Sequence, residues 1–274
     1  MTAEYCKSKA SVYLNRILDY IESTIQKSCN NRNHVLVSSW DQGTEIFGWS
    51  SSIHNRISKM IYLSHVGYKI ADQTFNVEKD IVIPPYVPTA KINAIKDSYE
   101  SLALEKGYYY RGILASFRGT VLSDAVYSRG SRQHLMKFKN STSFLIQDYH
   151  CSTYWDELIR SKFSFCPMGW TYWTARMFES IIVETIPIVI TEDFALLPFE
   201  NIVDYSSIIL RITPEQFTQI DNMQDWVDSI NLKYNYYRKS IKKVKKMLTY
   251  NEKIEEGDAI SLIVQELKEK IKSS

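Results

Sequence analysis

Apolar residues near the N-terminus are spaced as in an amphipathic helix. They recur every three or four positions, at Leu14, Ile17, Leu18, Ile21 and Ile25. This spacing places them on one face, and the polar run KSCNNRN that follows predicts the helix end. We therefore expect a helix over residues 8–27, a strand at HVLVS and then a polar, glycine-containing loop, SWDQGTEIFGWSSS.

From about residue 80 onward, short apolar runs alternate with helical patterns. The stretch DIVIPPYVP is typical of a short strand stopped by prolines, and residues 90–106 have a helical pattern. The predicted strands that follow are residues 111–117, SFLIQDY, KFSFCP and IPIVI. The predicted helices are residues 123–139 (capped by Ser123 and Asp124), 153–161, 174–184, 214–230 (beginning at Thr213) and a tail from about residue 232. Such alternation indicates parallel βαβ units and a doubly wound α/β sheet.

Composition narrows the choice of partners. The chain has 274 residues, 45% of them hydrophobic, with 33 basic and 31 acidic side chains. This near-balance gives no general attraction to nucleic acid or to an anionic membrane. The lysine-rich stretch YYRKSIKKVKKM carries an apolar stripe, so we interpret its lysines as the solvated face of a packed helix. Four widely spaced cysteines favour reduced thiols over a zinc site.

A glycine-containing loop leads into the predicted helix 174–184. Unpaired backbone N–H groups and the dipole at such a helix start attract phosphate, and Gly169 lets the backbone approach it. Arg176 would neutralise a diphosphate, and Glu179, one turn further on the same face, would accept hydrogen bonds from ribose hydroxyls. The alternative is a surface ion pair between the two side chains.

More basic residues follow the first strand of this series. The chain contains no Asp-x-Asp pair, the usual carboxylate ligand of a metal–diphosphate complex. Arg118, Arg129 and Arg132 could converge with Arg176 at the carboxyl ends of the strands. Each is otherwise interpreted as a solvated charge.

Residues 161–210 resemble the C-terminal signature of the exostosin-like glycosyltransferases, glycosyltransferase family 47. The signature has a strand and loop, a helix with Arg and Glu, an IPV strand, an LPF segment and an acidic–aromatic pair. Its counterparts here are Ser161, Phe163, Cys166, Pro167, Gly169, Thr174, Arg176, Glu179, Ile186, Pro187, Val189, Asp193, Leu197, Pro198, Phe199, Asp204 and Tyr205. KDIVIPPYVP, ASFRGTV and NHVLVSSWDQG are similar to upstream family segments, so the resemblance covers roughly residues 33–210.

The resemblance implies a glycosyltransferase B fold with two Rossmann-like domains that face a cleft. We expect an acceptor-side domain over residues 1–110, a nucleotide-sugar domain over 111–230, and helices over 231–274 that pack back on the body. It also implies inversion at the anomeric carbon and no required metal. The compact chain, without the family's usual anchor and stem, resembles enzymes of large algal viruses. We accordingly expect a cytoplasmic protein with no membrane segment.

The loop at residues 168–173 departs from the family pattern. Many members have arginines there, whereas this chain has Met168, Trp170 and Thr171. The aromatic side chains Trp170, Tyr172 and Trp173 favour a neutral sugar, although they can also be packing residues. We therefore predict transfer from a UDP-sugar to a hydroxyl of a glycan or glycoprotein, with xylose first and galactose or glucose next. The alternatives are a catalytically silent sugar-nucleotide or glycan-binding module and, with less support, a hydrolase.

The catalytic base is expected from the N-terminal domain. Asp41 lies on the loop after strand 34–38 and matches the acidic position of the family segment. It would deprotonate the acceptor hydroxyl, with Asp72 as the next candidate. Glu45, His54 and His65 are further alternatives, and Asp41 can also be a loop-capping carboxylate.

Overall fold

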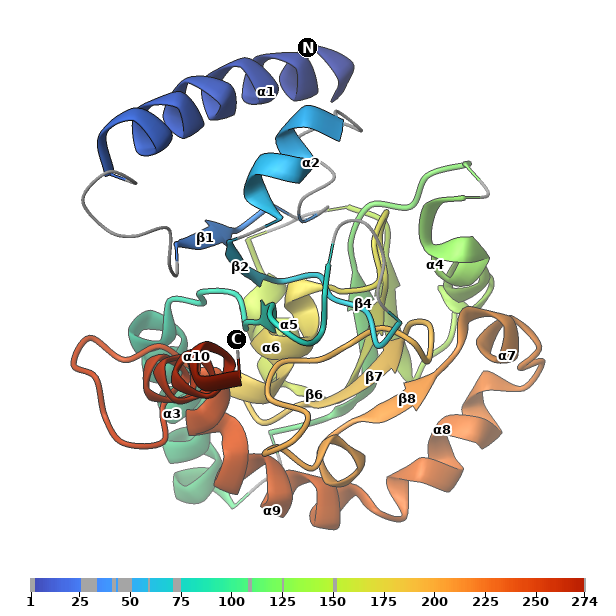
Figure 1. Cartoon of the computed structure of the whole chain (residues 1–274). Coiled ribbons are helices and arrows are strands. Elements are labelled where there is room, and N and C mark those ends of the chain that lie inside the picture. The colour runs from blue at the N-terminus through green and yellow to red at the C-terminus, as the bar shows by residue number, and fades with distance from the viewer. Residues whose placement is uncertain are drawn as a thin grey trace. The chain divides into compact units, whose positions relative to one another are not determined.

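A computed structural model describes residues 3–25, 34–40, 43, 51–58, 60–70, 75–107, 110–124, 126–149 and 152–273. The chain divides into two compact units (Figure 1). Unit 1 comprises Met1–Ile83, Phe194–Phe199 and Ser261–Ser274, and unit 2 comprises Pro84–Asp193 and Glu200–Ile260. These units differ from the expected domains, which were divided at residues 110 and 230. That division stays a prediction.

Unit 1 contains a three-stranded parallel sheet. Its strands are β1 (Val35–Ser38), β2 (Ile61–Ser64) and β3 (Ile81–Val82), in that order. Helix α1 (Ala3–Tyr20) continues as a π-helical turn, η1 (Ile21–Ile25), and packs against α2 (Ser51–Ile57). The predicted stripe supplies Leu14 and Leu18 to this core, whereas Ile17 is exposed.

A later segment of the chain returns to unit 1. Lys69 donates its N–H to the Phe194 carbonyl at 2.8 Å, and Leu196 donates to the Gly67 carbonyl at 2.9 Å. The LPF segment of the family signature therefore belongs to the smaller sheet unit. Helix α10 (Ala259–Ser273) is also tied there, because the Lys270 ammonium donates to the Val77 carbonyl at 2.6 Å.

Unit 2 is built on a five-stranded parallel sheet. The strands are β4 (Ile113–Arg118), β5 (Phe144–Gln147), β6 (Ser161–Pro167), β7 (Ile186–Ile190) and β8 (Leu210–Ile212). Their order in the sheet is β5-β4-β6-β7-β8. The chain thus moves outward in one direction from β4 and then returns to continue in the other, as a doubly wound sheet does.

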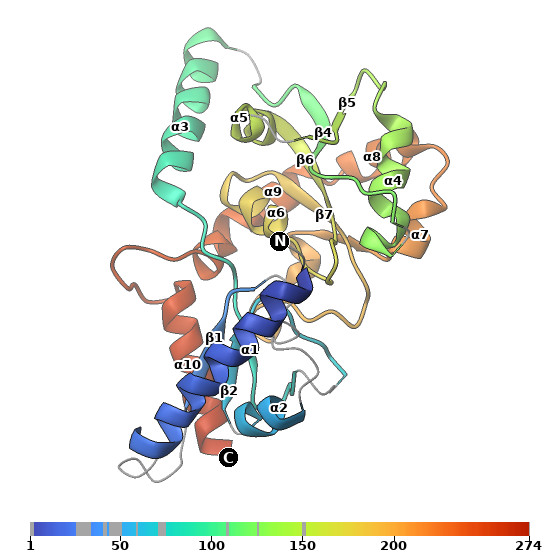
Figure 2. The ribbon, with the colours of Figure 1, turned by 90° about the horizontal axis from the view of Figure 1, so that it is seen from above.

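Helices cover both faces of this sheet. Figure 2 shows α5 (Tyr154–Ile159) and α6 (Ala175–Ile182) on one face, with α4 (Ser131–Leu135), α7 (Pro214–Thr218) and α8 (Met223–Asn231) on the other. Helices α3 (Thr89–Lys106) and α9 (Tyr234–Val244) complete the unit, with the 3-10 turns η5 (Tyr205–Ser207) and η6 (Lys245–Leu248). The prediction of an α/β fold with two Rossmann-like, parallel-sheet units, as in the glycosyltransferase B class, is confirmed.

Two predicted helices are interrupted. The prediction of a single helix over 123–139 is wrong. The structure has η3 (Tyr127–Gly130), α4 and η4 (Met136–Phe138) in succession. Ser128 and Arg129 have φ values of 56° and 46°, which a right-handed helix does not allow. Asp124 caps a turn instead, because its Oδ1 accepts the Val126 N–H at 2.8 Å.

The helix predicted over 214–230 is also divided, into α7 and α8. Its start is confirmed, since Thr213 and Gln216 form a capping box. The Asn222 side chain then accepts the Asp225 N–H at 3.2 Å and begins a second helix.

Candidate donor site at the sheet switch point

The predicted site residues gather where the winding of the large sheet reverses. Strands β4 and β6 are neighbours, with Ser116 opposite Ser164 in the register. The chain leaves β4 at Arg118 toward α4 on one face, and leaves β6 at Pro167 toward α6 on the other. Diverging connections of this kind open a crevice at the carboxyl ends of the two strands, where α/β sheets bind ligands.

Arg176 reaches into this crevice from the first turn of α6. Its Nη2 donates to the main-chain carbonyl of Arg118, and its guanidinium carbon lies 4.8 Å from the centre of the Phe117 ring. The residue is only 9% exposed. Among the described residues, nothing accepts a hydrogen bond from its Nε or Nη1. A buried cation with two open donors is costly unless an anion binds there.

A small pocket surrounds this guanidinium. It is lined by Ser116, Phe117, Arg118, Tyr154, Glu157, Leu158, Ser164 and Arg176. The backbone also makes room for the arginine at Gly119, where a Cβ would lie 2.8 Å from Arg176 Nη2. Glycine is therefore the residue that lets the end of β4 approach Arg176 so closely.

Arg118 is in the pocket, but its charge is balanced. Its Nε donates to Glu157 Oε2 at 2.7 Å, and its Nη2 donates to Oε1 at 2.5 Å. Thr153 Oγ1 also donates to Glu157 Oε1, at 2.6 Å. This bidentate pair is a strong, oriented contact. Sequence reasoning missed Glu157, although its place in the first turn of a predicted helix was visible.

Arg132 serves mainly to hold the loops together. Its three nitrogens donate to the carbonyls of Met168, Thr120 and Pro167 at 3.1, 2.9 and 3.3 Å. Its Nη1 also donates to the Tyr127 hydroxyl at 2.5 Å. Burial lowers the pKa of Arg132 to about 10, and the charge of Arg176 adds to that effect. Arg132 thus contributes positive charge beside the site while its donors are occupied by the loops.

Arg176 and Glu179 are not an ion pair among the described residues. Glu179 Oε2 instead accepts a hydrogen bond from the Tyr154 hydroxyl of α5. The pKa of Tyr154 is raised well above its ordinary value, chiefly by burial, with Arg176 opposing and Glu179 adding to the shift. The surface ion-pair alternative is therefore not what the geometry shows: Glu179 binds the half-buried Tyr154, which lines the same pocket as Arg176.

The loop after β6 divides into buried and exposed side chains. Met168 and Thr171 are buried, whereas Trp170 is 47% exposed and lies edge-on to the Tyr127 ring at 5.1 Å. Gly169 is held by the bond from Ser128 N–H to its carbonyl at 3.0 Å. Trp170 is thus the loop side chain with an exposed aromatic face beside the predicted donor site.

Tyr172 forms a second contact with the loop before α4. Arg129 Nη2 donates to the Tyr172 hydroxyl at 3.3 Å, and Arg129 Nη1 lies 2.6 Å from Glu192 Oε1. Arg129, which is 49% exposed, is therefore paired at the rim rather than directed toward Arg176.

The candidate catalytic bases all belong to unit 1. Asp41, Glu45 and Asp72 lie outside the described residues, as does the side chain of His54. His65 Nδ1 lies 3.0 Å from the Ile83 carbonyl, and burial lowers its pKa. Within the described ranges, no group of three or more His, Cys, Asp or Glu side chains could hold a metal ion.

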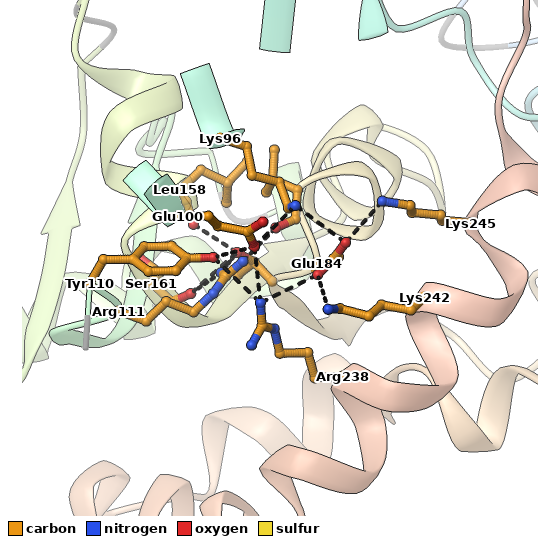
Figure 3. Close-up of polar contacts among 12 residues, drawn as sticks. Lys96, Glu100, Tyr110, Arg111, Leu158, Ser161, Glu184, Arg238, Lys242 and Lys245 are labelled. Carbon is orange, nitrogen blue, oxygen red and sulfur yellow. Dashed lines mark hydrogen bonds and ion pairs between the residues drawn. The ribbon is translucent and has the colours of Figure 1, made fainter. Parts of the chain in front are cut away.

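A second charged cluster lies at the opposite, amino-terminal end of the large sheet (Figure 3). Its centre is Glu184, which is 3% exposed and has a φ of 62°. Glu184 forms ion pairs at 3.4, 3.4, 3.5 and 2.9 Å with Lys96, Arg238, Lys242 and Lys245. These cations outweigh the cost of burial and lower the pKa of Glu184 to about 2.

Comparison with known proteins finds relatives that are named as probable glycosyltransferases. It is 29% identical over 253 residues to a probable glucuronoxylan glucuronosyltransferase of Arabidopsis thaliana, covering 87% of this chain and 52% of that protein. It is 25% identical over 198 residues to a probable β-1,4-xylosyltransferase of the same plant, covering 71% and 47%. The chain thus spans about half the length of these curated relatives.

A solved structure, Anabaena HepE in complex with UDP, aligns with 95% of this chain and 82% of its own at 8% identity and a TM-score of 0.47. In the described part of the chain, no helix is both long and apolar enough to cross a membrane. The model of the exostosin GT47 domain matches residues 4–225, which is most of the sequence. The chain therefore belongs to the exostosin GT47 family.

Proposed function

We propose that the chain is a glycosyltransferase that moves a sugar from a UDP-sugar to a hydroxyl of a glycan. The observation that carries this proposal is the Arg176 guanidinium, which is buried at the sheet switch point and has two nitrogens without a hydrogen-bond partner among the described residues. A diphosphate supplies oxygens for these donors and compensates the buried charge. Family membership and the transferase names of the relatives support the same activity.

The leaving diphosphate would be stabilised by arginine rather than by a metal. Arg176 would contact it, and the buried charge of Arg132 would add to the positive potential nearby. Arg118 would contribute little net charge because Glu157 balances it. We propose a metal-independent displacement on this basis, with Glu179 accepting hydrogen bonds from the ribose. We propose inversion at the anomeric carbon because the family resemblance implies it.

The sugar would be neutral, with xylose the first choice and galactose or glucose next. Among the described residues of the pocket, Arg176 has the open donors, and the diphosphate would occupy them. A glucuronic acid carboxylate would then lack a cation to replace its hydration. The relatives are named for both glucuronosyl and xylosyl transfer. Measuring which donor sugar the chain uses therefore tests the neutral-sugar proposal.

The acceptor hydroxyl would be deprotonated by Asp41, with Asp72 as the alternative. General-base catalysis contributes about two to four orders of magnitude to a rate. Asp41→Asn should therefore lower turnover by about that factor while UDP binding stays unchanged. Near-normal turnover would exclude Asp41 and make Asp72→Asn the next variant.

The deciding experiment is a panel of nucleotide sugars, assayed for binding and for slow donor hydrolysis with and without EDTA. We expect UDP-xylose, or another neutral UDP-sugar, to bind and hydrolyse slowly, with no effect of chelation. Saturable binding without hydrolysis or transfer would instead indicate a catalytically silent binding module. Preference for UDP-glucuronic acid would contradict the neutral-sugar proposal, and activity that requires added manganese would contradict the arginine account.

A further inference from the structure

Helix α5 contacts two of the predicted donor-site residues from one face. Tyr154 and Glu157 are three positions apart, so their side chains are neighbours on the helix. Both line the pocket around Arg176. Glu157 binds Arg118 bidentately, and the Tyr154 hydroxyl donates to Glu179 Oε2. One short helix therefore orients a cation and a carboxylate that come from different parts of the chain.

The contact leaves Glu179 able to bind a ligand. A carboxylate has two oxygens and about four acceptor positions, of which the Tyr154 hydroxyl occupies one. No other hydrogen bond to this carboxylate is found within the described ranges, so Oε1 and the rest of Oε2 can accept from a pair of hydroxyl groups. A glutamate held in place has already lost its rotamer freedom on folding, so less entropy is lost when the ligand binds.

Tyr154 is suited to this role because its hydroxyl remains protonated. Burial raises its pKa well above the ordinary value, and the neighbouring Glu179 charge acts in the same direction. The hydroxyl therefore remains a hydrogen-bond donor throughout the physiological range. Its ring is edge-on to Trp155 at 5.2 Å, so packing also fixes the ring itself.

We propose that Tyr154 is a positioning residue for ribose recognition, whose hydroxyl directs the Glu179 carboxylate toward the 2′- and 3′-hydroxyls of the nucleotide. This inference rests on the proposed function, because it takes the ligand of the Arg176 pocket to be a nucleoside diphosphate. Tyr154 acts through Glu179 and has no role in the transfer of the sugar. Its loss should weaken the selection for a ribose and leave the diphosphate contact in place.

The test compares UDP with 2′,3′-dideoxy-UDP, which lacks both ribose hydroxyls. Calorimetry on the full chain gives the affinity of each nucleotide for the wild type and for Tyr154→Phe, which removes a single oxygen atom. A neutral hydrogen bond accounts for about a two- to tenfold change in affinity, and one to a charged group for more. We expect Tyr154→Phe to bind UDP about tenfold more weakly and dideoxy-UDP almost as well as the wild type does.

Tyr99→Phe is the matched control. The Tyr99 hydroxyl donates to Asp156 Oδ1 at 3.0 Å, so it forms the same kind of bond to a carboxylate of the same helix. Neither Tyr99 nor Asp156 lines the pocket. Tyr99→Phe should leave the ratio of the two affinities unchanged. A role limited to the stability of α5 would affect the two variants alike.

A second measurement asks whether Tyr154 works through Glu179. In a double-mutant cycle, Tyr154→Phe should have little further effect on UDP affinity once Glu179→Ala is present. Equal losses for UDP and dideoxy-UDP, no loss for either, or additive losses in the cycle would overturn the inference. In those cases wild-type UDP binding still stands and the proposed function survives. Absence of UDP binding by the wild type would refute that function and this inference with it.

Discussion

The two charged clusters of the large sheet unit differ in how their charges are satisfied. At the amino-terminal end of the strands, Glu184 has four cationic partners, and Glu100 accepts from Lys96 and Arg238 at 3.1 and 3.2 Å. At the carboxyl end, Arg176 is bound through Nη2, while its Nε and Nη1 have no hydrogen-bond partner in the described part of the chain. The first cluster is completed by the chain itself, and the second is completed by a ligand in our account.

Arg111 and Arg176, one in each of these two regions, differ in the same way. Arg111, at the amino-terminal end, is fully buried, yet its Nη1 and Nη2 donate to Ser161, Thr185 and Val183 at 2.6–2.8 Å. Only its Nε has no partner among the described residues. The Val183 carbonyl follows α6 directly, so Arg111 also binds where the helix dipole favours a cation. Burial alone therefore does not mark a binding site, whereas open donors in a pocket do.

The largest expected effect on stability comes from the Glu184 cluster. Glu184→Gln removes the carboxylate that pairs with Lys242 and Lys245, and among the described residues it leaves Glu100 as the carboxylate partner of Lys96 and Arg238. Breaking a buried ion pair costs about 3–5 kcal/mol, and the free energy of unfolding in urea should fall by about that amount. In the folded fraction, UDP affinity should not change. A small loss of stability would show that solvent already screens this cluster.

The next prediction concerns the opposite cluster. Gly119→Ala would place a Cβ 2.8 Å from Arg176 Nη2, the flexible end of a side chain. The guanidinium should shift, so we expect UDP affinity to fall by about tenfold, the scale of one hydrogen bond. The melting temperature should stay close to that of the wild type. Gly112→Ala is a suitable control, because a Cβ there meets nothing within 4 Å.

A third effect is a pH dependence of the stability, limited to the amino-terminal cluster. The pKa of Glu184 is about 2 in the folded chain, against an ordinary 4.5. Its contribution to stability is thus fully present above pH 4.5 and is lost as the pH falls from 4.5 toward 2. The difference in unfolding free energy between wild type and Glu184→Gln should narrow over that range. A difference that stays constant between pH 7 and pH 3 would contradict the ionised state of Glu184.

The sequence allowed the convergence of arginines at the candidate site to be predicted, because the ends of the strands can be recognised in the sequence. Arg118 follows an apolar run, and Arg132 and Arg176 belong to the next segments that parallel winding brings to the same edge. Arg132 and Arg176 both lie close to Gly119. A Cβ added to Gly119 would be 3.7 Å from Arg132 Nη1 and 2.8 Å from Arg176 Nη2. The convergence follows from topology alone.

The partners of those arginines could not be predicted in the same way. Whether Arg118 binds Glu157 or a ligand depends on side-chain placement between β4 and α5, which no local pattern encodes. The prediction of a helix over 123–139 was wrong for a related reason. Ser128 and Arg129 have left-handed backbone conformations, and tertiary contacts such as the bond from Ser128 N–H to the Gly169 carbonyl support them. Strands β2 and β8 were not predicted from the sequence.

Calorimetric titration of Arg176→Ala with UDP measures whether Arg176 binds the diphosphate. A charge-assisted hydrogen bond is worth about 1.5–3 kcal/mol, so UDP affinity should fall about ten- to a hundredfold. The melting temperature should hold or rise, since a buried charge is removed. Arg160→Ala, which alters an exposed arginine at the other end of α5, should change neither. Unchanged UDP affinity in a folded Arg176→Ala would contradict the account.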